Sequence, residues 1–312
     1  MGGTNRMKKT RIAVIGFGNI GYHAVQAILS APDMELAGII RREGAKDQPL
    51  SFATFIDEKT DISALGVVDV ALLCKPSVQI EEYAKTYLSQ GIHTVDSFDI
   101  HSSIVDLRGN LDKVAKNNKS VAIISAGWDP GTDSVIRAML EAAAPVGITY
   151  TNFGPGMSMG HSVVARSKEG VENAISITIP LGTGVHRRMV YVQLEKDDHH
   201  KEKFPFKKIS DDIKHDDYFC HDETHVIEVS DVSVLADRGH GVSMTRKGRS
   251  GNCDNQFFNF EMRIHNPALT AQIMVSCARA CTRQQAGAYT MIEIPLIDLL
   301  PGDRDTIIKR LV

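Results

Sequence analysis

The stretch RIAVIGFGNIGYHAV, residues 11–25, joins a run of small apolar residues to three glycines and then to a helical pattern. The glycines have the spacing G-x-G-x-x-G between an expected strand and an expected helix. In that setting the first glycine permits a tight turn, the second lets a phosphate approach, and the third lets helix and strand pack closely. The helix N-terminus offers N–H groups to the phosphate. We therefore predict a dinucleotide site, whereas the alternative is that the glycines serve packing alone. Its expected residues are Gly16, Gly18, Asn19, Ile20 and Gly21.

The rest of the first half alternates apolar strands with amphipathic helices. Strands are expected at 34–42, 67–76, 93–99 and 121–131, and helices at 21–31, 80–91, 102–118 and 132–144. Alternating strands and helices form a parallel sheet with right-handed crossovers. The predicted fold class is therefore α/β, with a Rossmann-type doubly wound parallel sheet.

After about residue 148 the pattern changes to strands with little helix between them. Strands are expected at 147–153, 172–180, 187–195, 223–232, 240–248 and 255–265, with one clear helix near 205–214 and a long one over 266–287. This pattern predicts a second, α+β domain with a mostly antiparallel sheet, for substrate binding and dimerisation. We expect the dinucleotide-binding domain to cover 1–125, completed by about 270–312, and the second domain to cover 126–269.

Composition excludes several classes of protein. The chain has 312 residues, a net charge of −3 and 43% hydrophobic residues. Without a Lys/Arg-rich block or an apolar stretch of about 20 residues, neither nucleic acid nor membrane is an expected partner. Five cysteines without a CxxC pair and no signal-peptide pattern favour a cytoplasmic protein. His221 and His225 could bind zinc from one helix face, but the segment reads as a strand, so no metal is expected.

The end of the second strand carries a clue to the cofactor. Arg41 and Arg42 stand where an acidic residue would bind the ribose of NAD, and adjacent guanidinium groups can bind a 2′-phosphate. NADP(H) is therefore predicted, although Glu43 could be a ribose ligand and the arginines could be merely solvated. The next strand of the apolar series ends at the same edge of the sheet, and cofactor contacts are also expected from Cys74, Lys75 and Pro76.

Two further strand ends carry polar side chains. One has Asp96, Asp99 and His101, and the other has Trp128, Asp129, Asp133 and Ser134. Ligands of open α/β sheets bind beyond the carboxyl ends of the strands, so carboxylates there suggest a cationic group such as a substrate ammonium. Capping of the following helix by Asp129, Thr132 or Asp133 is the alternative.

Several of these blocks together resemble one enzyme family. GFGNIG, HTVDSFDIH, SAGWDPGTDS, TNFGPGMSMGHS and HNPALTAQ are similar to the motifs of the meso-diaminopimelate dehydrogenase family, closer to its shorter, broader-specificity branch. The resemblance implies reversible NADP-dependent oxidative deamination at the D-centre of meso-2,6-diaminopimelate, which yields L-2-amino-6-oxopimelate and ammonia, in lysine and cell-wall precursor metabolism. It also implies a homodimer.

The resemblance assigns roles to individual residues. Asp99 and Asp129 would be catalytic, and either could be the base. Substrate contacts are expected beside the D end from Trp128, Phe153, Met159 and Gly160, and at the distal L end from Thr178, Arg188, His240 and Asn266. A guanidinium fork suits a carboxylate, so Arg188 is the expected clamp. Thr178 could instead be a strand residue, His240 a loop residue and Asn266 a helix cap.

Two other functions remain open at this point. Lys75-Pro76 is similar to the Lys-Pro signature of sugar and polyol dehydrogenases of the glucose–fructose oxidoreductase type, in which the lysine is catalytic. The second alternative is a non-catalytic NADP sensor.

Overall fold

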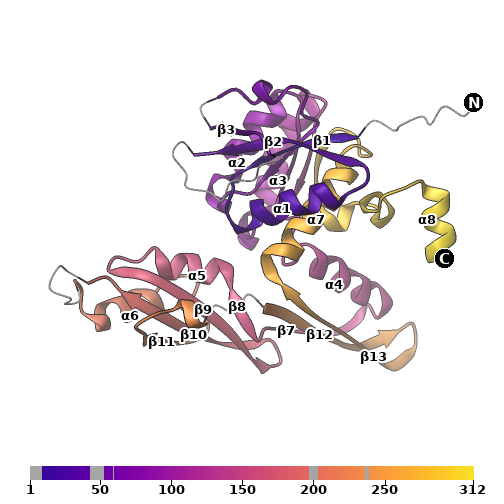
Figure 1. Cartoon of the computed structure of the whole chain (residues 1–312). Coiled ribbons are helices and arrows are strands. Elements are labelled where there is room, and N and C mark those ends of the chain that lie inside the picture. Colours follow the sequence, from indigo (N-terminus) through magenta and orange to yellow (C-terminus); the bar gives the residue numbers. More distant parts are fainter. Residues whose placement is uncertain (1–8, 43–52, 59, 197–202, 236–238) are drawn as a thin grey trace, which may run out of the picture. The chain divides into compact units, whose positions relative to one another are not determined.

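The chain divides into two compact units (Figure 1). The computed structural model describes residues 9–42, 53–58, 60–196, 203–235 and 239–312. The first unit contains Met1–Ala138 and Pro267–Val312, and the second contains Met139–Asn266. Within the described ranges, no helix is both long enough and apolar enough to cross a membrane.

The first unit is built on one seven-stranded sheet. Its strands are β1 (Thr10–Ile15), β2 (Met34–Arg41), β3 (Phe55–Asp57), β4 (Val70–Leu73), β5 (His93–Asp96), β6 (Val121–Ile124) and β14 (Gly287–Thr290). They lie in the order β14-β6-β5-β4-β1-β2-β3, and all neighbouring pairs are parallel. This order confirms the predicted Rossmann-type sheet.

Helices cover both faces of this sheet (Figure 1). Alternate residues of β1 face opposite sides, because side chains of a strand alternate. Ile12 and Val14 belong to a core formed with α1 (Asn19–Ser30) and α7 (Asn266–Cys281). Ala13 and Ile15 belong to the opposite core, formed with α2 (Ser77–Ser89) and α3 (Ile104–Asn117). The remaining helices that begin in this unit are α4 (Thr132–Ala143) and α8 (Arg304–Leu311), and the chain's short 3-10 helices are Ile62–Leu65, His101–Ser103, Ser233–Leu235, Met291–Glu293 and Leu296–Leu299.

Two strands of the sheet were not predicted. β3 has three residues, and β14, with the sequence GAYT, lacks the run of large apolar residues that marks β4 and β6, so neither stands out from the sequence. β14 pairs with β6 from Gly287 opposite Val121 to Thr290 opposite Ile124. The C-terminal segment therefore completes the sheet of the first unit.

The second unit contains two sheets, where the sequence suggested one. Its strands and helices are β7 (Val146–Phe153), β8 (Gly156–Ser158), α5 (Met159–Arg166), β9 (Val171–Gly182), β10 (Val185–Leu194), α6 (Phe206–Lys214), β11 (Glu223–Glu228), β12 (Gly239–Ser250) and β13 (Cys253–His265). One sheet has the order β11-β10-β9-β8 and the other the order β13-β12-β7. The pairs are antiparallel except for β10 with β11.

Helices α5 and α6 pack on the four-stranded sheet. Ala165 of α5 and Ile209 and Ile213 of α6 share a core with Val190 and Val192 of β10. The helix α5 is a correction to the prediction, which placed only the 205–214 helix between these strands. It has eight residues and contains Gly160, whose low helix propensity hides it from the pattern.

The two domain boundaries differ from those expected. The compact units meet after Ala138, within α4, and again between Asn266 and Pro267. The predicted positions were 125/126 and about 269/270. A strand end is a natural place to expect a boundary, but α4 continues directly from the segment that follows β6. The assignment of cofactor binding and substrate binding to the two domains stays a prediction.

Candidate active site

The glycine loop follows β1 and leads into α1. Gly16 has a φ of +96°, and a Cβ there would lie 2.5 Å from the carbonyl oxygen of Cys74. A Cβ on Gly21 would lie 2.2 Å from the carbonyl oxygen of Gly16. Fold geometry therefore explains these two glycines. A Cβ on Gly18 would have no heavy atom of the chain within 4 Å, so packing does not explain it.

The start of α1 suits an anion. Gly18 is the N-cap and makes no side-chain capping bond, and the first turn has no acidic residue. Asn19 and Ile20 begin the helix, so their backbone N–H groups are among those without an acceptor inside it. Open space at Gly18 and a helix N-terminus together fit a dinucleotide pyrophosphate.

Two arginines lie at the end of β2. The Arg41 guanidinium carbon lies 4.4 Å from the centre of the Phe55 ring, and Phe55 stands edge-on to Phe17 with 5.6 Å between ring centres. Arg42 follows the strand and is exposed. This pair fits a phosphate at the adenosine end of the cofactor. The alternative ribose ligand, Glu43, lies outside the described residues.

Cys74, Lys75 and Pro76 connect β4 to α2. Lys75 forms an ion pair with Glu58, and its ammonium lies 4.7 Å from the centre of the Tyr83 ring. The Tyr83 hydroxyl donates to the other Glu58 oxygen at 3.2 Å. Burial and the nearby Arg42 lower the pKa of Lys75, and burial raises the pKa of Cys74 to about 12. The pairing with Glu58 accounts for a partly buried lysine here without a catalytic role.

Asp96 and Asp99 mark the end of β5 and have different surroundings. Asp96 is fully buried and accepts the backbone N–H groups of Phe98 at 2.9 Å and Ser125 at 3.1 Å. It thereby links the segments that follow β5 and β6. Burial raises the pKa of Asp96 to about 6. Asp99 is less buried and accepts a hydrogen bond of 2.6 Å from the Ser77 hydroxyl at the start of α2.

Asp129 and Asp133 both follow β6, and the charge of Asp133 acts on Asp129. Asp133 is fully buried in the first turn of α4, and Nη2 of Arg137 lies 2.7 Å from its Oδ2. Burial, followed by the charge and hydrogen bond of Asp133 and by the charge of Asp99, raises the pKa of Asp129 to about 8, and Arg137 opposes this shift. We call Asp99, Asp129, Asp133 and Arg137 the acidic group. Trp128, next in the chain to Asp129, is buried with 6% of its surface exposed.

Arg188 lies on β10 opposite Thr178 of β9. Its Nε donates to Oδ2 of Asp222 at 2.6 Å, and its Nη1 donates to the Thr178 hydroxyl. Thr178 is fully buried. No described residue accepts a hydrogen bond from Nη2 of Arg188, so that nitrogen can serve a ligand. Asp222 was not predicted as a site residue, because its segment drew attention only as a possible zinc site.

Three histidines lie close enough to Arg188 for its positive charge to lower their pKa values. Burial, with Arg188 as the next cause, lowers the pKa of His161 and of His240 to about 4 and lowers the pKa of His186. His161 Nδ1 lies 2.8 Å from the Ser158 hydroxyl, and His186 Nε2 accepts the backbone N–H of Phe153 at 2.7 Å. We call Arg188, Thr178, Asp222, His161, His186 and His240 the arginine group.

The remaining predicted residues lie at ends of elements in the second unit. Phe153 ends β7 and its ring lies 5.6 Å from that of His186. Met159 and Gly160 begin α5 directly after Ser158. Asn266 begins α7 and is buried, with 7% exposed. The structure therefore brings Phe153, Thr178, Arg188 and His240 together around three residues that the sequence analysis missed: His161, His186 and Asp222. Of these, only His161 had a signal, as part of the quoted GMSMGHS block.

The zinc alternative is wrong. His225 lies on β11 and pairs with Glu223 at 2.7 Å, so His221 and His225 do not share a helix face. Within the described ranges, no group of three His, Cys, Asp or Glu side chains could hold a metal ion.

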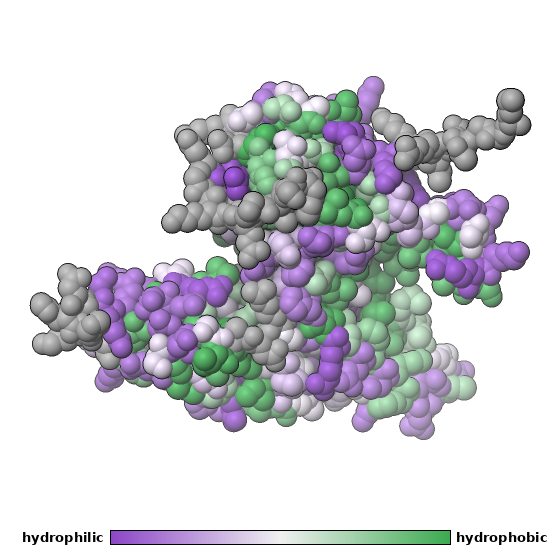
Figure 2. Space-filling model, in the orientation of Figure 1, coloured by the Kyte–Doolittle hydropathy of each residue, from purple (hydrophilic) through white to green (hydrophobic). Residues whose placement is uncertain are grey.

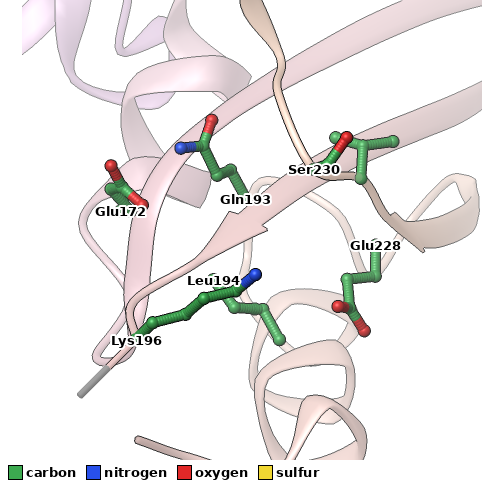
Figure 3. Close-up of a pocket in the computed structure, with 7 residues that line it drawn as sticks. Glu172, Gln193, Leu194, Lys196, Glu228 and Ser230 are labelled. Carbon is green, nitrogen blue, oxygen red and sulfur yellow. The ribbon is translucent and has the colours of Figure 1, made fainter. Parts of the chain in front are cut away.

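A separate pocket of about 270 Å³ lies at the end of β10 away from Arg188 (Figure 3). It contains none of the predicted site residues. Its lining residues are Glu172, Gln193, Leu194, Lys196, Glu228, Val229 and Ser230.

Comparisons with known proteins agree with this arrangement. Residues 127–266 match the diaminopimelic acid dehydrogenase C-terminal domain, and residues 10–97 match the NAD-binding Rossmann fold of an oxidoreductase family. The meso-diaminopimelate D-dehydrogenase of Bacteroides fragilis is 56% identical over 306 residues, which cover 98% of this chain and all of the relative. The enzyme of the same name from Ureibacillus thermosphaericus is 32% identical over 98% of this chain and all of its own.

Solved structures extend the similarity to the whole fold. The Corynebacterium glutamicum diaminopimelate dehydrogenase in complex with diaminopimelate has a TM-score of 0.87 and 29% identity, over 98% of this chain and all of that one. An engineered D-amino acid dehydrogenase bound to NADP⁺ has a TM-score of 0.85 and 28% identity, over the same shares of the two chains. Sequence and fold agree over nearly the full length, and the chain belongs to the meso-diaminopimelate D-dehydrogenase family.

Proposed function

We propose that the chain catalyses the reversible, NADP-dependent oxidative deamination of meso-2,6-diaminopimelate at its D-centre. The products are L-2-amino-6-oxopimelate, ammonia and NADPH. The observation that carries the proposal is the agreement in sequence and fold with diaminopimelate dehydrogenases over nearly the whole chain. Within the glycine-loop unit, burial and the charge of Asp133 raise the pKa of Asp129 to about 8. Such a group can exchange a proton with an amine near neutral pH.

NADP(H) fits the nucleotide unit. The pyrophosphate would bind at Gly18 and the first turn of α1, and the 2′-phosphate would bind at Arg41 and Arg42. When bound, the cofactor supplies the hydride acceptor for the D-centre carbon. The relative in complex with NADP⁺ supports this choice.

Asp129 is the proposed acid–base residue, and Asp99 is the proposed anchor for the ammonium. Ser77 holds the Asp99 carboxylate by a hydrogen bond of 2.6 Å. Ionised Asp129 takes a proton from the substrate ammonium and releases it to solvent, and it then takes a proton from the water that attacks the imine carbon. The base is ionised above its pKa of about 8, so oxidation should be faster at alkaline pH. In the reverse direction the protonated carboxyl group is the proton donor.

Arg188 is the proposed ligand of the distal carboxylate. Asp222 and Thr178 hold its Nε and Nη1, so the guanidinium is oriented before substrate arrives. Neutral His161 and His240 add no competing positive charge. The relative with bound diaminopimelate supports this substrate.

We also propose a cytoplasmic homodimer whose interface includes β13. This strand is the edge of its sheet, and its even-numbered residues from Phe258 to Ile264 are apolar and only half-buried. In the same sheet, Val146 and Ile148 of β7 and Phe257 of β13 are at least half exposed, and Figure 2 shows apolar surface among polar side chains in this region. An apolar edge of this length favours pairing with a second copy around a two-fold axis.

The test is reduction of NADP⁺ with separated meso-, LL- and DD-diaminopimelate, followed by absorbance. Turnover of the meso isomer with NADP⁺, and not of the LL isomer, is expected. Turnover of LL-diaminopimelate, or of a polyol that depends on Lys75, would contradict the proposal.

A further inference from the structure

We propose that Lys75 joins the two arginines at the end of β2 in binding the cofactor's 2′-phosphate, and that Glu58 holds Lys75 in place until the phosphate replaces it. The inference rests on the proposed function only through its cofactor, NADP(H). It assigns a task to an ion pair that the reaction does not use. It also adds Glu58 to the residues that set the preference between the two nicotinamide cofactors.

The ion pair of Lys75 and Glu58 crosses the edge of the sheet at which a dinucleotide binds. Lys75 follows β4 and Glu58 follows β3, and β1 and β2 lie between these strands in the sheet. Neighbouring strands are about 4.8 Å apart, so only long side chains can join the two ends. The Lys75 side chain passes the end of β1, because a Cβ on Gly16 would lie 3.4 Å from its Cδ. Its ammonium therefore lies beyond β1, towards β2.

Glu58 fixes the position of that ammonium at the end of β2. The backbone N–H of Glu58 donates to the carbonyl oxygen of Arg41 at 3.0 Å, and Arg41 is the last residue of the strand. Arg42, the next residue, is close enough to act on Lys75, since burial and then the charge of Arg42 lower the pKa of Lys75. Three cationic side chains thus belong to the strand end where the 2′-phosphate is expected.

The surroundings of Glu58 allow it to be replaced as the partner of Lys75. The Lys75 side chain is only 9% exposed, so its ammonium needs a nearby anion in the free protein, and Glu58 supplies it. The Tyr83 hydroxyl donates to the other Glu58 oxygen at 3.2 Å. The Glu58 side chain is 23% exposed, so it can keep the bond from Tyr83 and take water in place of Lys75. The exchange therefore leaves neither charge buried without a partner.

A 2′-phosphate is a stronger partner for Lys75 than a carboxylate. It carries a charge of about −1.5 to −2 at neutral pH and three acceptor oxygens, so it can bind Lys75 and the arginines at the same time. An ammonium has three N–H donors and can turn from one acceptor to the other without a change of the backbone. The ribose of NAD(H) has only a hydroxyl group at this position and cannot compete with Glu58. The exchange therefore favours NADP(H).

The experiment is calorimetric titration of the full-length, cofactor-free protein with adenosine 2′,5′-bisphosphate and with 5′-AMP, which differ only in the 2′-phosphate. Lys75→Met keeps most of the apolar stem and should weaken binding of the bisphosphate by about tenfold or more, with little change for 5′-AMP. Lys75→Arg keeps the charge and should keep most of the affinity. Lys85→Met removes an exposed lysine from α2 and is the control.

A second variant tests the exchange itself. Glu58→Gln removes the anion that competes for Lys75 and repels the phosphate, so the affinity for the bisphosphate should rise by about threefold or more. The affinity for 5′-AMP should change little. Glu82→Gln, at an exposed position of α2, is the control.

Three results would overturn the inference. Equal losses for the two ligands in Lys75→Met, or no loss, would mean that Lys75 does not bind the 2′-phosphate. Unchanged or weaker binding of the bisphosphate in Glu58→Gln would mean that the phosphate does not replace Glu58. A loss of 5′-AMP affinity in Glu58→Gln would mean that Glu58 binds the ribose instead. The titrations need no turnover, so they decide these roles even if the protein does not oxidise meso-diaminopimelate.

Discussion

The acidic group and the arginine group handle excess charge in opposite ways. In the acidic group, Arg137 pairs with Asp133 and acts on Asp129, and Arg137 is itself 37% exposed. Burial and the neighbouring carboxylates raise the pKa of Asp129 to about 8, so a proton on Asp129 lowers the negative charge. In the arginine group, Arg188 cannot lose its proton, so its neighbours adjust instead: Asp222 pairs with it and the histidines stay neutral. One group therefore stores an exchangeable proton, and the other presents a fixed positive charge.

The largest expected effect tests the exchangeable proton. Asp129→Asn removes the acid–base group, so kcat should fall by about 10²–10⁴-fold. NADPH affinity, measured by fluorescence titration, should stay near the wild-type value. Wild-type kcat in the Asp129→Asn variant would assign the proton transfer to Asp99 and remove the basis of the comparison.

The next effect tests the fixed charge. Arg188→Met keeps the length of the side chain but removes the charge-assisted bonds to the distal carboxylate, so kcat/KM for meso-diaminopimelate should fall by about 100-fold, mainly through KM. D-alanine has no distal carboxylate, and its slow turnover should change little. The control is Arg187→Met, which removes a 38% exposed neighbour on β10 that pairs with Glu223. A loss of NADPH affinity in the Arg188→Met variant as large as the loss of kcat/KM for meso-diaminopimelate would contradict the assignment.

The two groups should give opposite pH dependences of stability. Asp129 has a folded-state pKa raised from 3.8 to about 8, so its stabilisation is complete below about 3.8 and is lost as the pH rises through 8. His161 has a pKa lowered from 6.5 to about 4, so its stabilisation is complete above 6.5 and is lost as the pH falls through 4.

Calorimetric melting from pH 4 to pH 9 measures both slopes. Asp129→Asn should flatten the decline towards pH 9, and His161→Gln should flatten the decline towards pH 4, each by on the order of 1 kcal/mol. His215→Gln, at an exposed position, is the control. If both variants change the same side of the profile, the contrast between the groups is wrong.

The smallest expected effect tests whether Arg42 binds the cofactor and has no part in binding the substrate. Arg42→Ala should reduce the preference for NADP⁺ over NAD⁺ by on the order of tenfold, because one charge-assisted contact to the 2′-phosphate is lost. The KM for meso-diaminopimelate at saturating cofactor should be unchanged. The exposed Arg310→Ala on α8 is the control for loss of positive charge. An unchanged preference for NADP⁺ over NAD⁺ in the Arg42→Ala variant would mean that Arg42 does not contact the 2′-phosphate.

Much of the fold was predictable from the sequence because its signals are local. The apolar strands, the helical periodicity of α1 to α3 and the glycine spacing each depend on neighbouring residues. The short strands β3, β8 and β14 and the eight-residue helix α5 were missed, because each takes its place from pairing or packing partners distant in the sequence. The resemblance likewise named Asp99, Asp129 and Arg188 as site residues, and their proposed roles still await the experiments above.

By itself, the sequence determined the glycine loop, the order of strands and helices in the first half, and the presence of acidic and basic residues able to bind a zwitterionic substrate. Only the tertiary structure decided which of the ionisable side chains carry a charge. A pKa depends on burial and on charges within a few ångströms, and those distances arise when β9 meets β10, α4 follows β6, and Asp222 reaches Arg188. For this reason the sequence left the choice between Asp99 and Asp129 open, whereas burial and the charge of Asp133 raise the pKa of Asp129 and favour Asp129 as the base.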